Sequence, residues 1–444
     1  MLKLAVNDRL PAVGMPEAEI FDVIDNAHAS IASRWEAGLF GKPDTLPADI
    51  SVRVLAKLLE VNSNNSGVHT RDERSDYAKS RGVPWQPTRD IERSLLTQVM
   101  NLLGGNPNEF DGYVSSGGSE SNVQACWIGR DALRGDDFDV QVGMIAPNTI
   151  HNSVPKAGHI LSLYRDAETG QQVQYVDLDE NWGMDAQSLD GKIARLHSQG
   201  IKRAIVCISA GTTLNGICDD TPAIAEVLDR WENVHGFQTF LHVDAAFGGW
   251  VLPFQGDDRG LHRFINLTRN PRISSISIDF HKMALCPYDA GMLIVRKPHL
   301  GATRREVSNL TVGYEYLIRG SRSGATASAI WATINSIGIV GYKEIVNRCM
   351  ELRDFLYREL SDVRGIAVLP LGHINICPIA LDGRLSDSED ATLRTLFEQV
   401  FIHPGKLKQR SNEPEQEVFA LHPMPHHTLE ATEEFLGAIR KICR

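Results

Sequence analysis

The sequence contains no long apolar run, no paired-cysteine motif and no excess of basic residues, and each absence excludes a class of protein. No segment approaches the roughly 20 apolar residues that cross a bilayer. The formal net charge of −11 argues against a nucleic acid or an anionic membrane as partner. The seven cysteines are scattered, odd in number and without CxxC spacing, as expected for free thiols in a reducing compartment. The first apolar segment breaks too soon for a signal peptide, so we expect a cytoplasmic protein.

Two nucleotide-binding signatures, GxGxxG and glycine-lysine followed by serine or threonine, are also missing. What is present is ordinary for a soluble globular protein: 444 residues, 42% hydrophobic and 23% charged. This length is sufficient for more than one domain. We expect an N-terminal helical segment (1–60), a large α/β domain (61–325), and a linking helix with a small C-terminal α+β domain (326–444).

Short apolar runs alternate with helical patterns in the middle of the chain. Such alternation predicts a mostly parallel seven-stranded sheet flanked by helices, with the last run antiparallel to its neighbour. The expected strands contain residues 113–114, 142–146, 174–178, 204–209, 240–244, 273–278 and 292–296. The expected helices between them span 122–133, 184–197 and 221–235.

The two ends of the chain are predicted to be more helical. Apolar residues recur at helical spacing through 18–37 and 50–61, and a helix should begin near Thr88. A long helix is expected from about residue 326 to 360, interrupted at Gly338 and Gly341. The remaining expected elements are strands at 374–380 and 418–421, loops at 384–390 and 409–416, and a helix from Thr428.

A glycine-rich turn follows the first expected strand. Ser115-Ser116-Gly117-Gly118-Ser119-Glu120-Ser121-Asn122 leaves that strand and opens a helix. Glycines let the backbone approach an anion, and the free N–H groups at a helix start point toward it. The alternative is a simple helix-capping turn, and the turn alone does not decide between them. A phosphate cradle is favoured once Lys282 downstream is considered.

Lys282 follows His281, some forty residues after a carboxylate, Asp244, that ends an apolar run. A pyridoxal phosphate enzyme needs this combination, because its lysine forms a Schiff base with the cofactor aldehyde. The carboxylate keeps the pyridine nitrogen protonated, so that the ring accepts electrons. The alternatives are a solvated lysine and a capping aspartate. The apolar approach to both residues, and the small residues after Asp244, favour the cofactor.

Two further positions follow expected strands. His151 could stack on the pyridine ring, and Thr212 could reach the ring or the substrate. The alternatives are a surface histidine and a turn followed by a helix cap at Asp219 or Asp220. We interpret Cys286 as a buried structural thiol, and the histidines of 422–427 as part of a strand-to-helix turn, since their spacing fits no zinc pattern.

These residues resemble the group II pyridoxal phosphate-dependent decarboxylases of fold type I, from about residue 60 to the C-terminus. This family includes glutamate, aromatic amino acid and archaeal tyrosine/aspartate decarboxylases, with sphingosine-phosphate lyases as relatives. Five ordered elements carry the resemblance: 116–122; His151 with Ser153 and Lys156-Ala157; His242-Val243-Asp244-Ala245-Ala246; Asp279-Phe280-His281-Lys282; and Gly320-Ser321-Arg322-Ser323-Gly324.

The resemblance implies roles for individual residues around the cofactor. Gly118, Ser119 and His281 would hold the phosphate. His151 and Ala246 would cover the two faces of the ring, while Thr212 would approach its hydroxyl side. Asp244 and Lys282 would keep the roles given above.

The resemblance also implies a homodimer whose active sites take residues from both subunits. Ser321 and Ser323 would reach the neighbour's phosphate, and Tyr314 or Tyr316 would return a proton to the product. No metal is expected.

The predicted reaction is decarboxylation of an L-amino acid to its amine. The alternative is carbon–carbon cleavage of a phosphorylated amino alcohol, in which Arg304, Arg305 or Arg319 would bind the substrate phosphate. A third reading, a non-catalytic scaffold, is disfavoured by the intact set of Lys282, Asp244 and His151. Both acidic and aromatic substrates remain open, with specificity expected in loop 62–90, at Asn65, His69 and Trp85.

Overall fold

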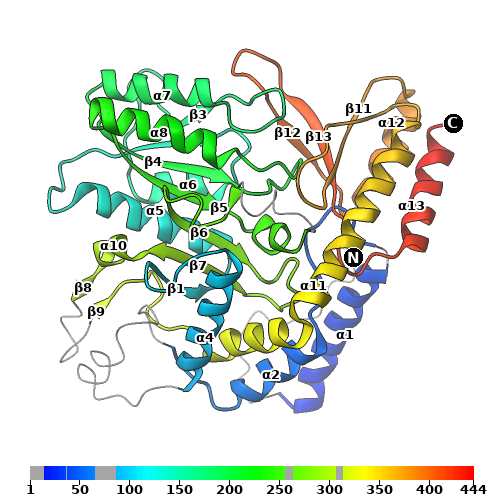
Figure 1. Ribbon diagram of the computed structural model, residues 1–444. Coiled ribbons are helices and arrows are strands. Elements are labelled where there is room, and N and C mark those ends of the chain that lie inside the picture. Colours follow the sequence, from blue (N-terminus) through cyan, green and yellow to red (C-terminus); the bar gives the residue numbers. More distant parts are fainter. Residues whose placement is uncertain (1–14, 37, 66–86, 256–263, 307–313) are drawn as a thin grey trace.

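The computed structural model describes residues 15–36, 38–65, 87–255, 264–306 and 314–444. Its centre is a seven-stranded sheet in the order β1-β7-β6-β5-β4-β2-β3 (Figure 1). Only β7 runs antiparallel to its neighbours, which confirms the expected mostly parallel sheet and its antiparallel last strand. The strands are β1 (Phe110–Ser115), β2 (Gly143–Pro147), β3 (Val173–Val176), β4 (Arg203–Ser209), β5 (Gln238–Asp244), β6 (Ile273–Asp279) and β7 (Gly291–Arg296).

Both faces of the large sheet are buried, because alternate residues of each strand enter two different hydrophobic clusters. In β4, for example, Val206 and Ile208 belong to one cluster while Ile205 and Cys207 belong to the other. This explains why the strands read as continuous apolar runs. The helices on the faces are α4 (Pro87–Leu102), α5 (Gly118–Arg134), α6 (Ser153–Ile160), α7 (Ala186–Ser198) and α8 (Thr221–His235), with α10 (Lys297–Leu300) beyond β7.

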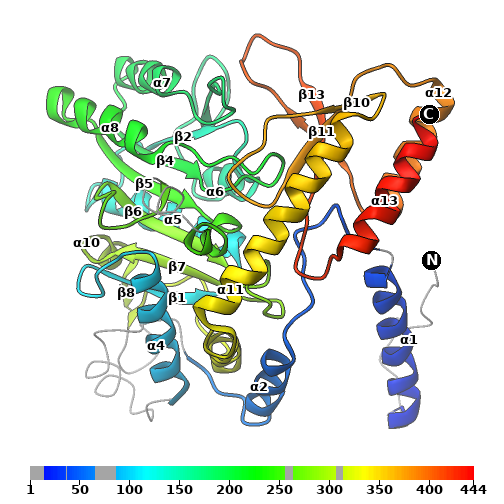
Figure 2. The ribbon, with the colours of Figure 1, turned by 45° about the vertical axis from the view of Figure 1, so that its right-hand side comes forward.

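A long helix, α11 (Gly324–Ser361), runs past the large sheet to a second, smaller sheet (Figure 2). Gly338 interrupts it with a φ of 68°, in the left-handed region that glycine tolerates. The second interruption, expected at Gly341, is wrong, since that residue has helical geometry. The helix is therefore interrupted once, at Gly338.

The smaller sheet is antiparallel, in the order β10-β11-β13-β12, with α12 and α13 beside it. The loop expected at 384–390 is partly wrong. A helix begins within it, because the side chain of Ser386 and that of Glu389 each bond to the other's backbone N–H. Thr428 caps the last helix, as expected. The elements are β10 (Ile366–Val368), β11 (Cys377–Leu381), α12 (Asp387–Gln399), β12 (Pro404–Leu407), β13 (Gln416–Leu421) and α13 (Leu429–Ile442).

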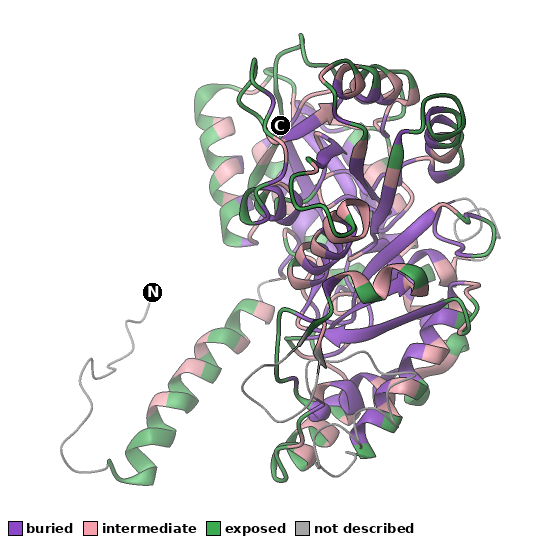
Figure 3. Cartoon of the chain, turned by 90° about the vertical axis from the view of Figure 1, so that its left-hand side faces the viewer, coloured by how far each residue is buried: buried purple, intermediate pink, exposed green. Residues whose placement is uncertain are grey.

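The N-terminal part is helical, with α1 (Glu17–Glu36) and α2 (Asp49–Leu59). Figure 3 shows α1 standing apart from the buried strands, with exposed and half-buried residues along its length. Among the described helices, none combines the length and the apolar character that a bilayer crossing requires. Two short strands, β8 (Arg305–Glu306) and β9 (Tyr314–Glu315), pair in the segment that precedes α11.

Candidate active site

A cavity of about 380 Å³ opens at the edge of the large sheet where β1, β4, β5 and β6 end. The carboxyl ends of parallel strands are where open α/β sheets bind ligands, and the volume suits a small cofactor. The cavity brings together eight of the twelve predicted site residues. They are Gly118, Ser119, His151, Thr212, Asp244, Ala246, His281 and Lys282.

The glycine turn forms one wall of this cavity. Gly117 caps α5 without a side-chain hydrogen bond and has a φ of 150°. A Cβ atom on Gly118 would lie 3.0 Å from the Cβ of Ala246 and 3.3 Å from Oδ2 of Asp279. A side chain at this position would therefore crowd Ala246 and Asp279. At these two glycines the helix start faces the cavity without a side chain, so its backbone N–H groups can approach an anion.

Glu120 holds the shape of this turn. Its Oε2 accepts hydrogen bonds from the backbone N–H and the hydroxyl of Ser116, at 2.9 and 2.6 Å. Its Oε1 accepts from the hydroxyl of Tyr113 at 3.1 Å, and Arg319 lies 3.5 Å from Oε2. Burial and the neighbouring Glu120 carboxylate raise the pKa of Tyr113 well above its usual value, so the phenol remains a donor.

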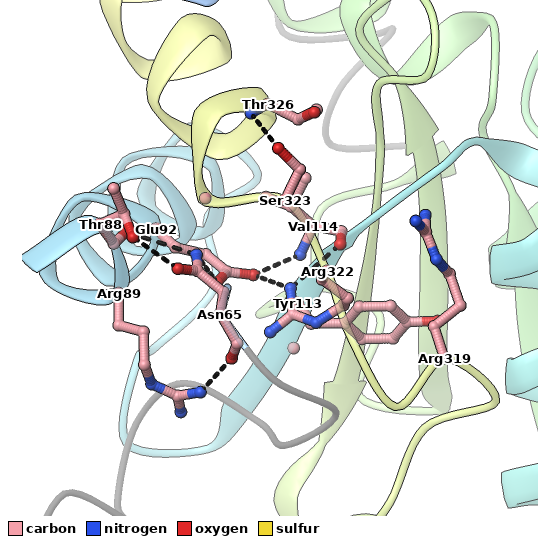
Figure 4. A network of polar contacts seen from close by, with 12 residues as sticks. Asn65, Thr88, Arg89, Glu92, Tyr113, Val114, Arg319, Arg322, Ser323 and Thr326 are labelled. Carbon is pink, nitrogen blue, oxygen red and sulfur yellow. Dashed lines mark hydrogen bonds and ion pairs between the residues drawn. The ribbon is translucent and has the colours of Figure 1, made fainter. Parts of the chain in front are cut away.

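A second buried network stands behind the turn (Figure 4). Glu92 of α4 accepts hydrogen bonds from the backbone N–H of Val114 at 2.8 Å and from the amide of Asn65 at 2.7 Å, and it also pairs with Arg322. The guanidinium of Arg322 lies 5.3 Å from the ring centre of Tyr113. Asn65, which we expected to select the substrate, is instead fully buried in this network. The other two expected specificity residues, His69 and Trp85, lie outside the described residues.

Lys282 enters the cavity beside a carboxylate. Its Nζ lies 3.2 Å from Oδ2 of Asp279, and Nε2 of His281 lies 3.5 Å from the same oxygen. No described residue bonds to the other oxygen, Oδ1. Burial lowers the pKa of His281, although Asp279 opposes the shift, and its ring stacks on that of Tyr288 at 4.2 Å. The lysine is thus held at the cavity by a buried partner.

Asp244 is held by neutral groups. Its Oδ2 accepts a hydrogen bond from the amide of Asn122 at 2.7 Å, and its Oδ1 accepts from the backbone N–H of Ala246 at 3.1 Å. The same amide donates to the hydroxyl of Ser153, which lies 2.8 Å from Nδ1 of His151. Asp244 and His151 are therefore linked through two side chains.

Thr212 lines the cavity from the loop after β4, where its hydroxyl bonds to Asn215. The sequence left open whether Asp219 or Asp220 caps the next helix. Asp220 caps α8 through the N–H of Ala223, whereas Asp219 accepts from the N–H groups of Met184 and Ser209. Burial raises the pKa of Asp219 to about 6.

Four predicted residues do not line the cavity described for this chain. Ser321 accepts a hydrogen bond from Asn64, and Ser323 caps α11. The backbone carbonyl of Tyr316 accepts from Gln124 and Thr303, while the side chain of Tyr314 lies outside the described residues. The roles of these four stay predictions, and those of Ser321 and Ser323 concern a neighbouring subunit.

The cavity also contains residues to which the sequence assigned no role, among them Asn122, Glu120, Asp279 and Tyr288. Asp279 stands three residues before Lys282, and Asn122 stands one turn into the helix after the glycines. Both lie within the motifs that identified the site. The spacing was a usable signal for Asp279, whereas the contacts of Asn122 depend on how β5, β6 and α6 approach α5.

Cys286 and the histidines of 422–427 lie outside the cavity wall. Cys286 is one of seven free cysteines, all buried. The histidines of 422–427 lie between β13 and α13, and no group of metal ligands occurs among the described residues.

The residues present fit pyridoxal phosphate. The close glycine turn offers N–H donors for a phosphate, and Asp279, with one unsatisfied oxygen, holds a lysine at the cavity. Asp244 offers a buried carboxylate within the same cavity. The sheet and this set of groups define an enzyme of the fold type I pyridoxal phosphate class.

Comparison with known proteins identifies the family. The family model described as "Pyridoxal-dependent decarboxylase conserved domain" matches residues 92–371. A probable L-tyrosine/L-aspartate decarboxylase from Methanothrix thermoacetophila is 31% identical, covering 90% of this chain and 88% of that protein. A probable L-aspartate decarboxylase from Pyrococcus abyssi is 27% identical, covering 98% of this chain and 100% of that protein. The chain belongs to the pyridoxal-dependent decarboxylase family, and its cofactor is pyridoxal phosphate.

Solved structures agree on the fold. A sphingosine-1-phosphate lyase from Burkholderia pseudomallei superposes with a TM-score of 0.77 over 98% of this chain and 92% of that one. At 19% sequence identity this similarity shows the fold alone. It confirms the predicted fold type I architecture.

Proposed function

We propose that this protein is a cytoplasmic homodimer that decarboxylates an L-amino acid to the corresponding amine. The observation that carries the proposal is the placement of Lys282. Its amine reaches a cavity that is also lined by the glycine turn and by the carboxylate of Asp244. The family membership and the decarboxylase relatives support the same reaction.

When bound, pyridoxal phosphate supplies a ring that accepts the electrons of the bond broken at the substrate Cα. Lys282 would hold this group covalently until the substrate amine displaces it. Asp244 would keep a proton on the ring nitrogen, and His151 and Ala246 would cover the ring. Thr212 would approach the hydroxyl side.

The phosphate would be held at the amino end of α5. Gly118 and Ser119 would donate their backbone N–H groups there, with His281 beside them. From the neighbouring subunit, Ser321 and Ser323 would complete the phosphate site. Tyr314 or Tyr316 would return a proton to the substrate carbon. We also propose that the chain divides near residues 60 and 325 into the three regions expected from the sequence.

The substrate side chain is the open choice. The relatives named for aspartate and tyrosine suggest an acidic or an aromatic amino acid. Besides Asp244, the described cavity wall contains the carboxylates of Glu120, Asp279 and Asp289, and it contains no arginine. An acidic substrate would therefore need a cation from outside this wall.

Carbon–carbon cleavage of a phosphorylated amino alcohol is the second candidate, and the arginines weaken it. Arg305 pairs with Asp131 and Arg319 with Glu120, and neither these residues nor Arg304 line the described cavity. A substrate phosphate would thus find none of the three arginines at the cavity wall.

The test is mass spectrometry of the products of the cofactor-loaded protein with single L-amino acids and, separately, with a phosphorylated amino alcohol. We expect an amine lighter than its parent by carbon dioxide. Release of an aldehyde with phosphoethanolamine would instead establish the lyase, and an absence of product in both sets would favour the scaffold.

A further inference from the structure

Asn122 makes more hydrogen bonds at the site than any role assigned so far explains. It lies on α5, one turn after the glycine turn, and is fully buried. Its Nδ2 lies 2.7 Å from Oδ2 of Asp244 and 2.8 Å from Oγ of Ser153. Its Oδ1 lies 2.8 Å from Oγ of Ser277 and 2.9 Å from Nε2 of His242. An amide has two donor and two acceptor sites, so every one of them is used.

The direction of each bond follows from Asp244. A carboxylate only accepts hydrogen bonds, so the amide nitrogen of Asn122 must face it. The amide oxygen then faces β5 and β6 and must accept from both Ser277 and His242. Burial lowers the pKa of His242 to about 4, although Asp244 opposes the shift, so this ring is neutral near pH 7 and carries one proton. That proton must sit on Nε2, which leaves Nδ1 to accept from Ser275 at 2.8 Å.

The other branch leads to His151. Since Nδ2 of Asn122 donates to Ser153, the hydroxyl of Ser153 is free to donate to Nδ1 of His151. The backbone N–H of Ser153 points at the same nitrogen, at 3.2 Å. Two donors therefore converge on Nδ1, which must accept, so the ring proton lies on Nε2. His151 offers a hydrogen-bond donor to whatever the cavity holds.

We propose that Asn122 is a positioning residue, which fixes the orientation of the Asp244 carboxylate and directs the Ser153 hydroxyl toward His151. This inference rests on the proposed function, because it assigns Asp244 and His151 to the cofactor. Through one amide, α5 joins the end of β5 to the start of α6. Asp244, proposed to contact the edge of the cofactor ring, and His151, proposed to contact its face, are thereby held in fixed positions relative to each other.

Two substitutions separate the donors of Asn122 from its acceptors. Asn122→Asp keeps the size and the oxygen that faces Ser277 and His242, but it sets a second carboxylate against Asp244. Asn122→Leu removes all four bonds. Thr221→Val is the matched control, because it removes one buried hydrogen bond, to the carbonyl of Phe264, away from the cavity.

The first measurement uses cofactor-free protein labelled with ¹⁵N in histidine, with the His242 signals assigned by their loss in His242→Gln. We expect the proton of His242 on Nε2 in the wild type and in Asn122→Asp, and on Nδ1 in Asn122→Leu, because the acceptor is gone. A wild-type proton on Nδ1 would overturn the inference, since the amide would then face the other way. This result depends on neither cofactor nor substrate.

The second measurement is the dissociation constant of pyridoxal phosphate, followed by its visible absorbance. Loss of a hydrogen bond to a charged group predicts a constant raised about tenfold or more in both Asn122 variants, and an unchanged constant in Thr221→Val. Wild-type affinity in Asn122→Asp would overturn the inference while leaving the proposed function intact. If the wild type itself binds no cofactor, the proposed function fails, and the nitrogen spectra still decide the orientation of the amide.

Discussion

Two aspartates end neighbouring strands of the large sheet, and their surroundings differ. Asp244, at the end of β5, accepts hydrogen bonds from neutral donors on both oxygens. Asp279, at the end of β6, faces Lys282 and His281 with one oxygen and has no described partner for the other. Both side chains are almost completely buried.

The difference separates two uses of a buried carboxylate. Neutral donors fix Asp244 without neutralising it, so its charge remains available to a cation that enters the cavity. Asp279 is already paired with an ammonium group, and that pairing must change when the lysine reacts. We therefore expect the first carboxylate to act on the cofactor ring and the second to position the lysine.

The largest effect is expected from removing the lysine between them. Lys282→Ala should abolish the visible absorbance of the lysine-bound cofactor and lower turnover by about 10⁴-fold or more, because no other described amine lines the cavity. Absorbance spectra and amine yield by mass spectrometry measure both effects. Turnover retained at more than a few per cent would contradict the assignment of this residue.

Asp244→Asn should have the next largest effect. The amide has the same shape but cannot hold a proton on the ring nitrogen, and its NH₂ group would face either Asn122 Nδ2 or the N–H of Ala246. We expect turnover to fall by about 10³-fold with the protein still folded. Steady-state kinetics and a thermal melt distinguish lost chemistry from lost stability.

Asp279→Asn sharpens the comparison, because we expect it to lower turnover less than tenfold. The lysine loses a charged partner but keeps its place in the cavity wall. The same kinetic measurement applies, with Asp244→Asn assayed beside it. A loss as large as that of Asp244→Asn would reverse the two roles and make Asp279 the carboxylate of the ring.

The sequence predicted the part of the fold that depends on local burial. All seven strands of the large sheet appear where apolar runs occur. A strand that is buried on both faces is apolar along its whole length, so it is recognised as a continuous run. The short strands β8, β9, β10 and β12 were missed. The start of α12 was missed although a capping signal, Ser386 with Glu389, was present.

The site residues could be predicted only where residue type and spacing along the chain indicate a chemical role. Lys282, Asp244 and the glycine turn were identified in this way. Asn122 does not, since its four partners come from three elements and only the folded sheet brings them together. The roles proposed for Ser321 and Ser323 concern a neighbouring subunit, so the structure of one chain does not test them.

The smallest effect is expected at His427, a buried ionisable group away from the cavity. It provides a comparison for Asp244, which is also buried among neutral groups. Burial, with the nearby His426 and His422, lowers the pKa of His427 to about 2, and its Nδ1 accepts a hydrogen bond from the N–H of Met424. Below its unfolded pKa of about 6.5 the unfolded chain binds a proton that the folded chain refuses, so stability falls as the pH falls.

Between pH 6.5 and pH 5 this histidine should cost about 2 kcal/mol of unfolding free energy, at 1.36 kcal/mol per pH unit. His427→Asn keeps an acceptor for Met424 and cannot take up the proton. Urea unfolding at pH 7 and pH 5 should show a drop in stability smaller by about that amount in the variant, while Lys282→Ala, which leaves this turn intact, should retain the full drop. Equal drops in wild type and His427→Asn would mean that the turn opens to water before the ring is protonated.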